Sequence, residues 1–376
     1  IIGGPSRNRN FRGKRLYNSA YFLHEGKIKD IYHKSLLPTY DVFDEYRYFE
    51  PHDEPHVVSF NGERIALTIC EDLWDTGDMP LYVHSPMEKL IEQSPDLIIN
   101  IAASPYHLGQ QQTREDVLTT NAKKYKLPLL YVNHVGAQTE LLFDGNSMAI
   151  NAKGEAVDML LSFEEDFRIV DTDTLKEGGV STAVEHKDRD AMGELEAALV
   201  MGIRNYFSKL GFKKAILGLS GGIDSALTLV LAVEALGADN VLSVLLPSRF
   251  SSDHSVNDAR QLAENLGSPY KLISIESAFR EFESILKPHF EGREFGLAEE
   301  NIQARSRALI LMALSNKFSY ILLNTSNKSE AAVGYGTLYG DMCGGLSVLG
   351  DVYKSDVFKM SKYINRPGSF SAALSS

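Results

Sequence analysis

A short apolar segment that runs directly into a pair of glycines is the feature that most constrains the fold of this chain. Residues 216–226 read ILGLSGGIDSA, which predicts a buried strand, a tight loop and the first turn of a helix. Residues 220–222 can turn several backbone N–H groups toward one anion, because glycine accepts the required dihedral angles and has no side chain. The helix adds the positive end of its dipole. The segment therefore predicts a phosphate site, although two glycines after a strand can also form only a tight turn.

The second half of the chain alternates between strands and helices. A helical pattern over residues 190–211 ends at Gly211, a residue type typical of a helix C-terminus. The segments that follow alternate between strand and helix, in the order AILGL, SALTLVLAVEALG, VLSVLLP, SVNDARQLAENLG and KLISI. Such alternation predicts a doubly wound parallel sheet.

The first half of the chain has short β-rich runs separated by turns. A hairpin is expected across Glu25 and Gly26, and further strands are expected at RIALTIC, DLIINIA, LPLLYVNHV and NSMAINAKGEAV. Helical stretches such as MEKLIEQ lie between some of them, which predicts a layered α/β domain. Residues 171–189 are polar and contain glycine, as linkers do. We therefore expect two domains, over residues 1–170 and 190–376, and a length of 376 residues suits that number.

Composition narrows the class of protein. Asp and Glu outnumber Lys and Arg by 50 to 38, and the net charge of −12 argues against general binding to nucleic acid. The basic run at residues 7–15 is expected to be a solvated loop. The apolar stretch over residues 308–314 is far shorter than the roughly 20 residues that span a bilayer, so no membrane segment is expected. Two cysteines in unrelated contexts indicate a reducing compartment, and we expect a cytoplasmic protein.

Residues 220–225, SGGIDS, resemble the pyrophosphate loop of the ATP pyrophosphatase family, which adenylates a carboxylate or carbonyl oxygen before ammonia attacks it. The resemblance extends over most of residues 190–365 to the glutamine-dependent NAD synthetase family. It is carried by LPSRFSSDHS, ENIQARSRALILMALSN and NTSNKSEAAVGYGTLYGDMCGGLSVLGDVYKSDVF. The resemblance implies ATP and deamido-NAD as substrates and Mg²⁺ as a cofactor, whereas zinc, haem and flavin are not expected.

The same resemblance implies a set of binding residues in the second domain. Those expected to bind ATP are Gly218, Leu219, Ser220, Gly221, Gly222, Ile223, Asp224, Ser225, Thr325 and Lys354. Those expected to bind deamido-NAD are Asn301, Arg305, Glu330, Tyr335, Gly336, Thr337 and Leu338. Asp224 and Glu330 are expected to ligate the metal. Taken singly, Thr325 and Asn301 could each cap a helix, and Lys354 could be a solvated surface lysine.

Cys70 ends the strand-like segment RIALTIC in the first domain. A cysteine in this position is usually inert core packing. The alternative is a nucleophile on a strand-to-helix elbow, where a helix start lowers the thiol pKa and presents the sulfur to solvent. Lys34, in YHKSLLPTYDVFDE, together with Cys70 and no plausible histidine partner resembles the nitrilase superfamily, whose amidases use Glu, Lys and Cys.

This second resemblance covers nearly all of residues 1–170, through SPYHLGQQQTRED and YVNHVGAQTELLFDGNSM. It implies that Cys70 forms a thioester with glutamine, that Lys34 stabilises developing charge and that Glu45 is a second acid beside the lysine. The residues expected to bind glutamine are Tyr40, Trp74, Ser104 and Arg114.

Both resemblances extend beyond the residues at hand. The general-base glutamate of the nitrilase family precedes the lysine in a Pro-Glu motif, no such motif precedes Lys34, and Glu25 is a poor substitute in a turn. We therefore expect the base to lie in an N-terminal piece that precedes the IIGG start. Likewise, the ATP lid that follows YIN in the family is either absent from the ending RPGSFSAALSS or altered in it.

Together the resemblances imply a nitrilase-like α-β-β-α sandwich joined to a doubly wound ATP pyrophosphatase domain. The implied reaction converts ATP, deamido-NAD, glutamine and water to AMP, pyrophosphate, NAD⁺ and glutamate, with ammonia channelled between two sites. Homo-oligomers are implied as well, because NAD synthetases pair through this domain. The alternatives are another glutamine amidotransferase of the ATP pyrophosphatase type and a catalytically silent nucleotide-binding protein.

Overall fold

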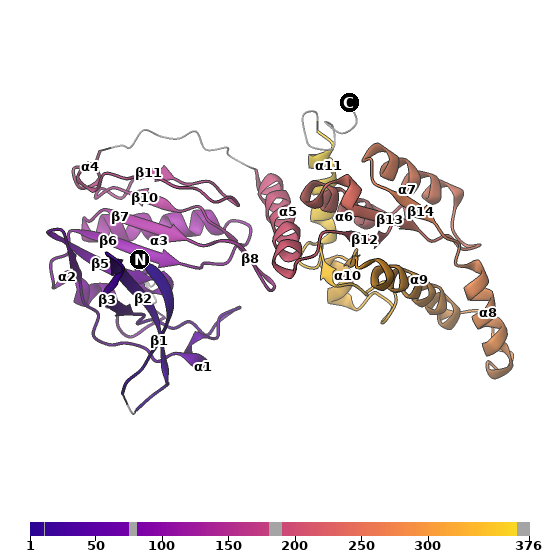
Figure 1. Cartoon of the computed structure of the whole chain (residues 1–376), viewed down its shortest axis with the longest axis horizontal. Coiled ribbons are helices and arrows are strands. Elements are labelled where there is room, and N and C mark those ends of the chain that lie inside the picture. Colours follow the sequence, from indigo (N-terminus) through magenta and orange to yellow (C-terminus); the bar gives the residue numbers. More distant parts are fainter. Residues whose placement is uncertain (11, 75–80, 180–189, 367–376) are drawn as a thin grey trace. The chain divides into compact units, whose positions relative to one another are not determined.

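The computed structural model describes residues 1–10, 12–74, 81–179 and 190–366 (Figure 1). The chain divides into two compact units, Ile1–Asp188 and Arg189–Ser376. Each unit has its own sheets and its own clusters of buried apolar side chains.

The first unit is built on a six-stranded mixed sheet and a three-stranded antiparallel sheet. The larger sheet has the order β11-β10-β7-β6-β5-β4, in which β5, β6 and β7 are parallel to one another. Its strands are β4 (Val58–Phe60), β5 (Glu63–Ile69), β6 (Leu97–Ala102), β7 (Leu129–Asn133), β10 (Met148–Ile150) and β11 (Ala156–Met159). The smaller sheet consists of β1 (Ile2–Arg7), β2 (Leu16–His24) and β3 (Lys27–His33).

Several β-hairpins shape this unit. Strands β2 and β3 form the predicted one, and Glu25 and Gly26 have φ values of 51° and 70° at its turn. Two positive φ values in succession are what a two-residue type I′ turn requires. Residues 146–157, expected as strand, instead form β10 and β11 around a turn that contains Gly154 at φ 80°. The strands β8 (Val135–Gln138) and β9 (Leu141–Asp144) form a further hairpin.

Helices cover one face of the six-stranded sheet, and the three-stranded sheet covers the other. Leu90 of α2 (Pro86–Ile91) and Leu118 of α3 (Gln110–Tyr125) pack against Ile98. On the opposite face, Phe22 and Tyr32 of the small sheet pack with Leu67. One helical layer and two packed sheets are three layers of the nitrilase-like α-β-β-α sandwich that the resemblance implies. The first unit also contains the short helix α1 (Glu45–Tyr48).

Helix α4 (Thr172–Lys176) lies in the segment expected to be a linker. Its Leu175 is buried against Ala149 and Val157, and the Leu175 carbonyl accepts a hydrogen bond of 3.1 Å from the N–H of Ala152. The segment as far as α4 therefore packs on the first unit. Residues 180–189 lie outside the described residues, so the position of the linker stays a prediction.

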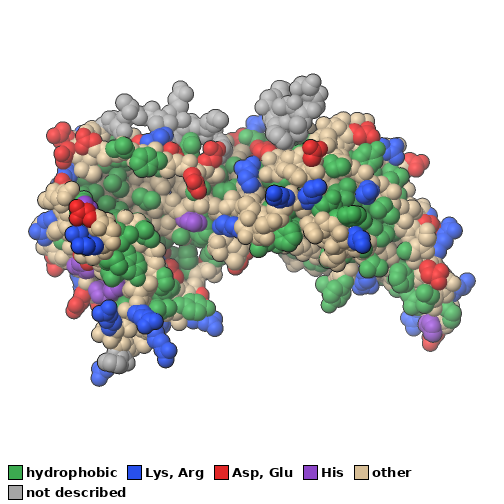
Figure 2. Space-filling view, in the orientation of Figure 1, with side chains coloured by type: hydrophobic (Ala, Val, Ile, Leu, Met, Phe, Trp, Pro, Cys, Tyr) green, Lys and Arg blue, Asp and Glu red, His purple; other side chains and the backbone are tan. Residues whose placement is uncertain are grey.

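The basic segment at residues 7–15 joins β1 to β2. Arg7, Arg9, Arg12 and Arg15 are exposed, and Lys and Arg side chains gather around its tip (Figure 2). This confirms the expected solvated loop. No helix within the described residues is both long and apolar enough to span a membrane.

The second unit has a five-stranded sheet of order β14-β13-β12-β15-β16, in which all neighbours are parallel. The strands are β12 (Ala215–Gly218), β13 (Val241–Leu245), β14 (Tyr270–Leu272), β15 (Ile321–Asn324) and β16 (Leu346–Ser347). The chain leaves β12 toward β13 on one side and later returns to β15 on the other. The loops after β12 and β15 thus diverge, and this is where a doubly wound sheet forms its crevice.

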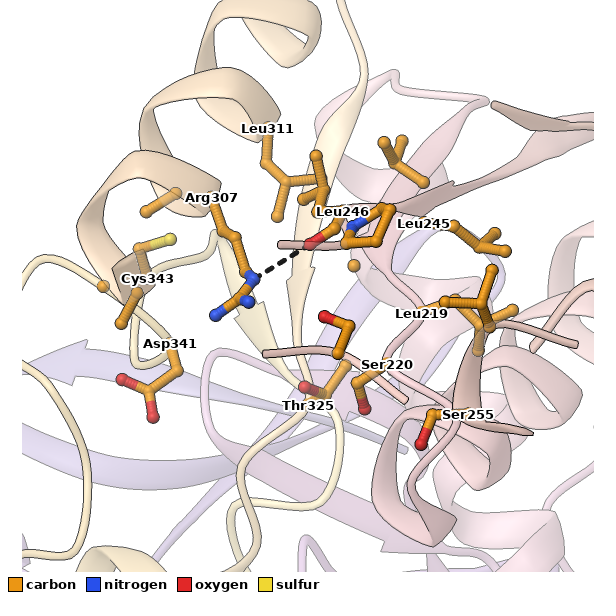
Figure 3. A pocket seen from close by; sticks show the side chains of 18 of the residues that line it. Leu219, Ser220, Leu245, Leu246, Ser255, Arg307, Leu311, Thr325, Asp341 and Cys343 are labelled. Carbon is orange, nitrogen blue, oxygen red and sulfur yellow. Dashed lines mark hydrogen bonds between the residues drawn. The ribbon is translucent and has the colours of Figure 1, made fainter. Parts of the chain in front are cut away.

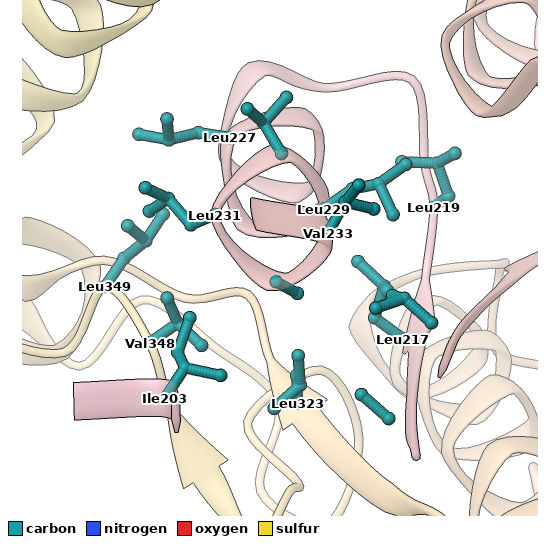
Figure 4. Close-up of a cluster of buried hydrophobic side chains, with 14 of the residues drawn as sticks. Ile203, Leu217, Leu219, Leu227, Leu229, Leu231, Val233, Leu323, Val348 and Leu349 are labelled. Atoms are coloured by element: carbon teal, nitrogen blue, oxygen red, sulfur yellow. The ribbon is translucent and has the colours of Figure 1, made fainter. Parts of the chain in front are cut away.

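Helices lie on both faces of this sheet. They are α5 (Ala191–Leu210), α6 (Ile223–Leu236), α7 (Asp253–Asn265), α8 (Glu276–Leu286), α9 (Leu297–Phe318), α10 (Lys328–Val333) and α11 (Lys354–Ile364). Leu217 packs among side chains of α5 and α6 (Figure 4), whereas its neighbour Ile216 packs with Leu311 of α9 on the other face. Helix α5 ends at Gly211, φ 74°, as the sequence predicts. The predicted doubly wound parallel sheet is confirmed.

Replacing Leu217, which is fully buried, by alanine is expected to lower the free energy of unfolding of the second unit by about 2–5 kcal/mol. The matched control is Leu210→Ala, a change at the exposed end of α5 that is expected to cost less than about 0.5 kcal/mol. Urea unfolding followed by circular dichroism measures both. Fluorescence of Trp74, the one tryptophan of the chain, reports the first unit separately. Equal losses in the two variants would contradict the assignment of Leu217 to the core.

Candidate active sites

Cys70 follows β5 and begins a single 3₁₀ turn, Cys70–Leu73. Its φ of 44° lies in the left-handed region, which a residue with a side chain adopts only when its surroundings impose it. The residue is 9% exposed and lines a cavity of about 170 Å³. A cysteine with this backbone conformation at the wall of a cavity favours the nucleophile over inert core packing, and the catalytic role of Cys70 stays a prediction.

Lys34 and Glu45, which the sequence pairs with this cysteine, form a close ion pair. Lys34 is 1% exposed, and its Nζ donates to Oε1 and Oε2 of Glu45 at 2.7 and 2.8 Å. Asn18 Nδ2 donates to the same carboxylate at 3.2 Å. Glu45 is the first residue of α1, so this short helix brings the carboxylate to the lysine.

Burial governs the ionisation of the thiol. It raises the pKa of Cys70 to about 11, and the positive charge of Lys34 offsets only part of this effect. Burial alone would lower the pKa of Lys34, but the charges of Cys70 and Glu45 raise it above its ordinary value, so the amine is an ammonium ion. The prediction that a helix start lowers the Cys70 pKa is therefore wrong, because the turn is short and the sulfur is withdrawn from water. The positive charge of Lys34 lowers the pKa of Cys70, so it would stabilise the thiolate once a base has removed the proton.

Three of the four residues expected to bind glutamine line the cavity beside Cys70. They are Tyr40, Trp74 and Ser104. Arg114 does not line it, because its fully buried guanidinium pairs with both carboxylate oxygens of Asp144 at 2.8 and 2.6 Å. Arg114 Nε also donates to Ser104 Oγ at 3.2 Å. In this structure the arginine holds Ser104 in place, and direct contact with glutamine stays a prediction.

Glu71 is a cavity residue that the sequence analysis did not identify. It is 3% exposed, and its carboxylate accepts hydrogen bonds from the hydroxyls of Tyr40 at 2.8 Å and Tyr82 at 3.1 Å. Burial raises the pKa of Glu71, and the two tyrosine hydroxyls oppose that change. A carboxylate at the cavity wall offers a partner for the ammonium group of an amino acid. The sequence did contain a signal for Glu71, because a charged residue there directly follows Cys70, the predicted nucleophile.

Alkylation of Cys70 by iodoacetamide is expected to accelerate about tenfold per pH unit from pH 7 to pH 10 without reaching a plateau. The reason is that the pKa of about 11 keeps the reactive thiolate scarce over this range. Peptide mass spectrometry measures Cys70 and Cys343 separately. A plateau below pH 8 would mean that Lys34 stabilises the thiolate more than burial opposes it.

A larger cavity, of about 550 Å³, opens at the carboxyl ends of β12, β13 and β15 in the second unit (Figure 3). This is the crevice at the point where the strand order reverses. The residues expected to bind ATP that line it are Gly218, Leu219, Ser220 and Thr325. Strand β13 contributes Leu245, with Leu246 following it.

A close backbone contact and internal hydrogen bonds define the shape of the glycine loop. Gly221 has a φ of 82°, and a Cβ atom there would lie 2.3 Å from the Ser255 carbonyl oxygen, so no other residue fits. Ser220 Oγ accepts a hydrogen bond from the N–H of Gly222 at 3.2 Å, and Ser225 Oγ donates to the Gly222 carbonyl at 2.9 Å. Helix α6 begins directly after Gly222, and the first N–H groups of a helix have no partner within it. These groups can bind an anion.

Asp224 and Lys354, far apart in sequence, meet at this loop. The Asp224 carboxylate accepts hydrogen bonds from Lys354 Nζ and, at 2.9 Å, from Asn327 Nδ2. Asn327 is fully buried and was not identified from the sequence. It also caps α10, because its Oδ1 accepts from the N–H of Glu330 at 3.1 Å while Glu330 Oε2 accepts from the N–H of Asn327 at 3.2 Å. Asn327 therefore joins the two carboxylates that are expected to ligate the metal.

The residues expected to bind deamido-NAD form a network on α9 and the loop after α10. Thr337 Oγ1 donates to Asn301 Oδ1 at 2.7 Å, and Arg305 Nε donates to the Leu338 carbonyl at 3.1 Å. Tyr335 is exposed, and a Cβ on Gly336 would lie 2.7 Å from Met342. The structure thus joins Asn301 to Thr337 and Arg305 to Leu338, whereas Glu330 lies on α10 and bonds to Asn327. The role of these residues in binding stays a prediction.

Arg307 is a further residue that the sequence analysis did not single out. It projects from α9 into the larger cavity (Figure 3), and its Nε donates to the Leu246 carbonyl at 3.1 Å. Burial lowers its pKa, and nearby Asp341 opposes that change. An arginine that points into this cavity can position a polar ligand. Cys343 lines this cavity and also a neighbouring cavity of about 770 Å³.

Substitution of Gly221 by alanine is expected to weaken the binding of inorganic pyrophosphate at least about tenfold, because the methyl group collides with Ser255 and displaces the loop. Gly292→Ala is the matched control, since Gly292 has a φ of 76° but open space around it. Its affinity for pyrophosphate is expected to equal that of the wild type. Isothermal titration calorimetry measures both, and undiminished binding by the Gly221 variant would contradict the assignment.

Comparison with known proteins adds independent evidence. Two family models match the chain, carbon-nitrogen hydrolase over residues 1–177 and NAD synthase over residues 195–372. The glutamine-dependent NAD(+) synthetase of Synechocystis sp. is 45% identical over 356 residues, which are 94% of this chain and 64% of that protein. The enzyme of the same name from Thermotoga maritima is 41% identical, over 93% of this chain and 65% of its own length.

A solved structure is similar across both units. It is that of a glutamine-dependent NAD+ synthetase from Acinetobacter baumannii in complex with adenosine diphosphate. It is 40% identical to this chain with a TM-score of 0.89, over 96% of this chain and 67% of that one. The chain spans a little less than two thirds of the length of the two sequence relatives.

Proposed function

Because the chain belongs to the family of glutamine-dependent NAD⁺ synthetases, we propose that it transfers the amide nitrogen of glutamine to deamido-NAD at the expense of ATP. The products are NAD⁺, glutamate, AMP and pyrophosphate. One observation supports the proposal above all. A single chain carries a Cys70–Lys34–Glu45 cavity in one unit and the glycine loop at the crevice of a doubly wound sheet in the other.

The proposed reaction of the first unit is hydrolysis of glutamine. Cys70 Sγ, once deprotonated, attacks the side-chain amide carbonyl, and the Lys34 ammonium stabilises the negative charge that develops. Ammonia leaves, water then cleaves the thioester, and glutamate is released. Glu45, hydrogen bonded to Lys34, is placed to exchange protons there. Glu71 would pair with the α-ammonium group of the substrate.

The proposed reaction of the second unit activates and replaces a carboxylate oxygen. The nicotinate carboxylate of deamido-NAD attacks the α-phosphorus of ATP, pyrophosphate leaves toward the loop at residues 220–225, and ammonia then displaces AMP. Lys354 and the first amides of α6 supply positive charge for the leaving group. The donor set of Asp224 and Glu330, two carboxylates joined through Asn327, fits Mg²⁺, a cation that prefers oxygen ligands and phosphates. When bound there, Mg²⁺ would neutralise phosphate charge.

The nitrogen that leaves glutamine is the nitrogen that enters NAD⁺. Water competes for the adenylate and an ammonium ion cannot attack it, so transfer without release to solvent is part of the proposal. Isotope dilution tests this step. When glutamine turns over in the presence of ¹⁵N-ammonium at a concentration near that of glutamine, the NAD⁺ formed is expected to stay largely unlabelled. Full equilibration of the label would refute channelling.

We also infer a cytoplasmic homo-oligomer. Support for pairing comes from the cavity of about 770 Å³ beside α9, which is lined mostly by apolar side chains. Leu309 and Tyr339, two of its lining residues, are 64% and 85% exposed. Exposed apolar surface of this kind is typical of an interface between subunits. Sedimentation velocity of the full-length protein measures the oligomeric state.

Pyrophosphate release by the full-length protein, with ATP, Mg²⁺ and deamido-NAD, tests the reaction. The wild type is expected to be active with glutamine or ammonium. Cys70→Ala is expected to lose about a thousandfold or more of the glutamine-dependent rate, because the nucleophile is gone, and to keep the ammonium-dependent rate. The ammonium reaction thus serves as the internal control for folding of the second unit. Binding of ATP without release of pyrophosphate from either donor would favour a silent nucleotide-binding protein.

A further inference from the structure

Asp72 is a buried carboxylate for which the proposed reaction has no use. It is 2% exposed, lies in the 3₁₀ turn two residues after Cys70, and is not among the residues that line the cavity of about 170 Å³. A buried carboxylate is costly unless hydrogen bonds compensate it. The groups that compensate Asp72 indicate what it does.

Asp72 joins two segments that carry the reacting groups. Its Oδ1 accepts hydrogen bonds from the backbone N–H groups of Ser35 at 3.1 Å and Leu36 at 2.9 Å. Its Oδ2 accepts from the N–H of Ile69 at 3.0 Å and from the Tyr32 hydroxyl at 3.4 Å. Ser35 and Leu36 directly follow Lys34, and Ile69 directly precedes Cys70. One carboxylate thus fixes the backbone on both sides of the lysine–cysteine pair.

The strained backbone at Cys70 needs such support. A φ of 44° persists at a cysteine only when neighbouring bonds determine it, and the bond from Ile69 to Asp72 closes the turn around Cys70. Lys34, in turn, reaches its site from a segment that runs on from β3. The N–H groups of Ser35 and Leu36 bonded to Asp72 prevent this segment from sliding past the turn.

We propose that Asp72 is a positioning residue for the thiol of Cys70, because it holds the Lys34 ammonium beside the sulfur as the thiolate forms. The proposal deepens the glutaminase function proposed above and rests on it. Asp72 acts through Lys34 and Cys70 and does not itself touch the substrate.

If Asp72 positions Lys34, its replacement should raise the pKa of the Cys70 thiol, whereas if Asp72 acts only through its charge, its replacement should lower that pKa. Lys34 lowers the pKa of the Cys70 thiol, whereas the negative charge of Asp72 raises it, to a lesser extent. Removal of the Asp72 charge without movement of Lys34 would therefore lower the thiol pKa. Loss of the Lys34 position would raise it. Local unfolding would also lower it, because burial is what raises this pKa most.

The variant Asp72→Asn separates these cases, because an amide of the same shape offers a single oxygen and cannot serve both segments. The pH profile of iodoacetamide labelling at Cys70 is expected to move upward, with labelling at pH 8 about three- to tenfold slower than in the wild type. The kcat for glutamine hydrolysis is expected to fall about tenfold or more, with the KM for glutamine within about threefold. An unchanged or lowered profile would overturn the proposal.

Asp158→Asn is the matched control. Asp158 is a buried carboxylate on β11 of the same unit and has no part in the site, so neither the labelling profile nor glutamine hydrolysis is expected to change. Trp74 fluorescence during urea unfolding reports whether each variant folds. The two proposals can fail separately. If the labelling profile of Asp72→Asn moves upward but the wild type does not hydrolyse glutamine, the positioning role of Asp72 stands and the glutaminase function is refuted.

Hydrogen exchange in the wild type tests the same bonds without a variant, should Asp72→Asn fail to fold. The amides of Ser35, Leu36 and Ile69 are expected to exchange at least about a hundredfold more slowly than in the unfolded chain, since each is bonded to a buried carboxylate. Exchange of these amides as fast as in an unfolded chain would overturn the proposal.

Discussion

The Lys34 side chain is almost completely removed from water, and it keeps its charge because the Glu45 carboxylate lies 2.7 Å away. A buried charge is costly unless an opposite charge pairs with it, so the segment that carries the partner must lie close by. Helix α1 is held against the sheet by this ion pair, and the turn at Cys70 is held by Asp72. In the second unit the Asp224 carboxylate is paired in the same way. It accepts hydrogen bonds from Lys354 of α11 and from Asn327 at the start of α10. In both units, paired charges bring together segments that are distant in sequence.

Local features of this architecture could be predicted from the sequence. The parallel sheet, the hairpin at Glu25 and Gly26 and the loop after β12 follow from periodicity and from residues whose conformational needs are local. Glu71, Asp72 and Asn327, three of the residues that escaped prediction, each have a partner at least 31 positions away in the chain, namely Tyr40, Ser35 and Asp224. Their types are compatible with many surroundings, so the spacing of residues does not reveal these distant partners.

One expectation about the first unit was wrong. The Cys70 thiol was expected to be acidic because a helix start follows it, but its pKa depends on how much water the folded chain removes, which is a property of the packing. Contact between Arg114 and glutamine stays a prediction, and in the structure the buried guanidinium of Arg114 pairs with Asp144 of β9. A residue type implies a chemistry, whereas the fold decides whether that residue meets the ligand or supports a neighbour that does.

Cys343 lines two cavities, and this position matters for the design of covalent ligands. This side chain lines both the cavity of about 550 Å³ and the apolar cavity beside α9, and burial raises its pKa and so slows its reaction with unselective reagents. A weak electrophile held by either cavity would react there by proximity rather than by intrinsic reactivity. A covalent ligand anchored at this thiol could extend into one chamber or the other, so one attachment point would serve two distinct families of inhibitors.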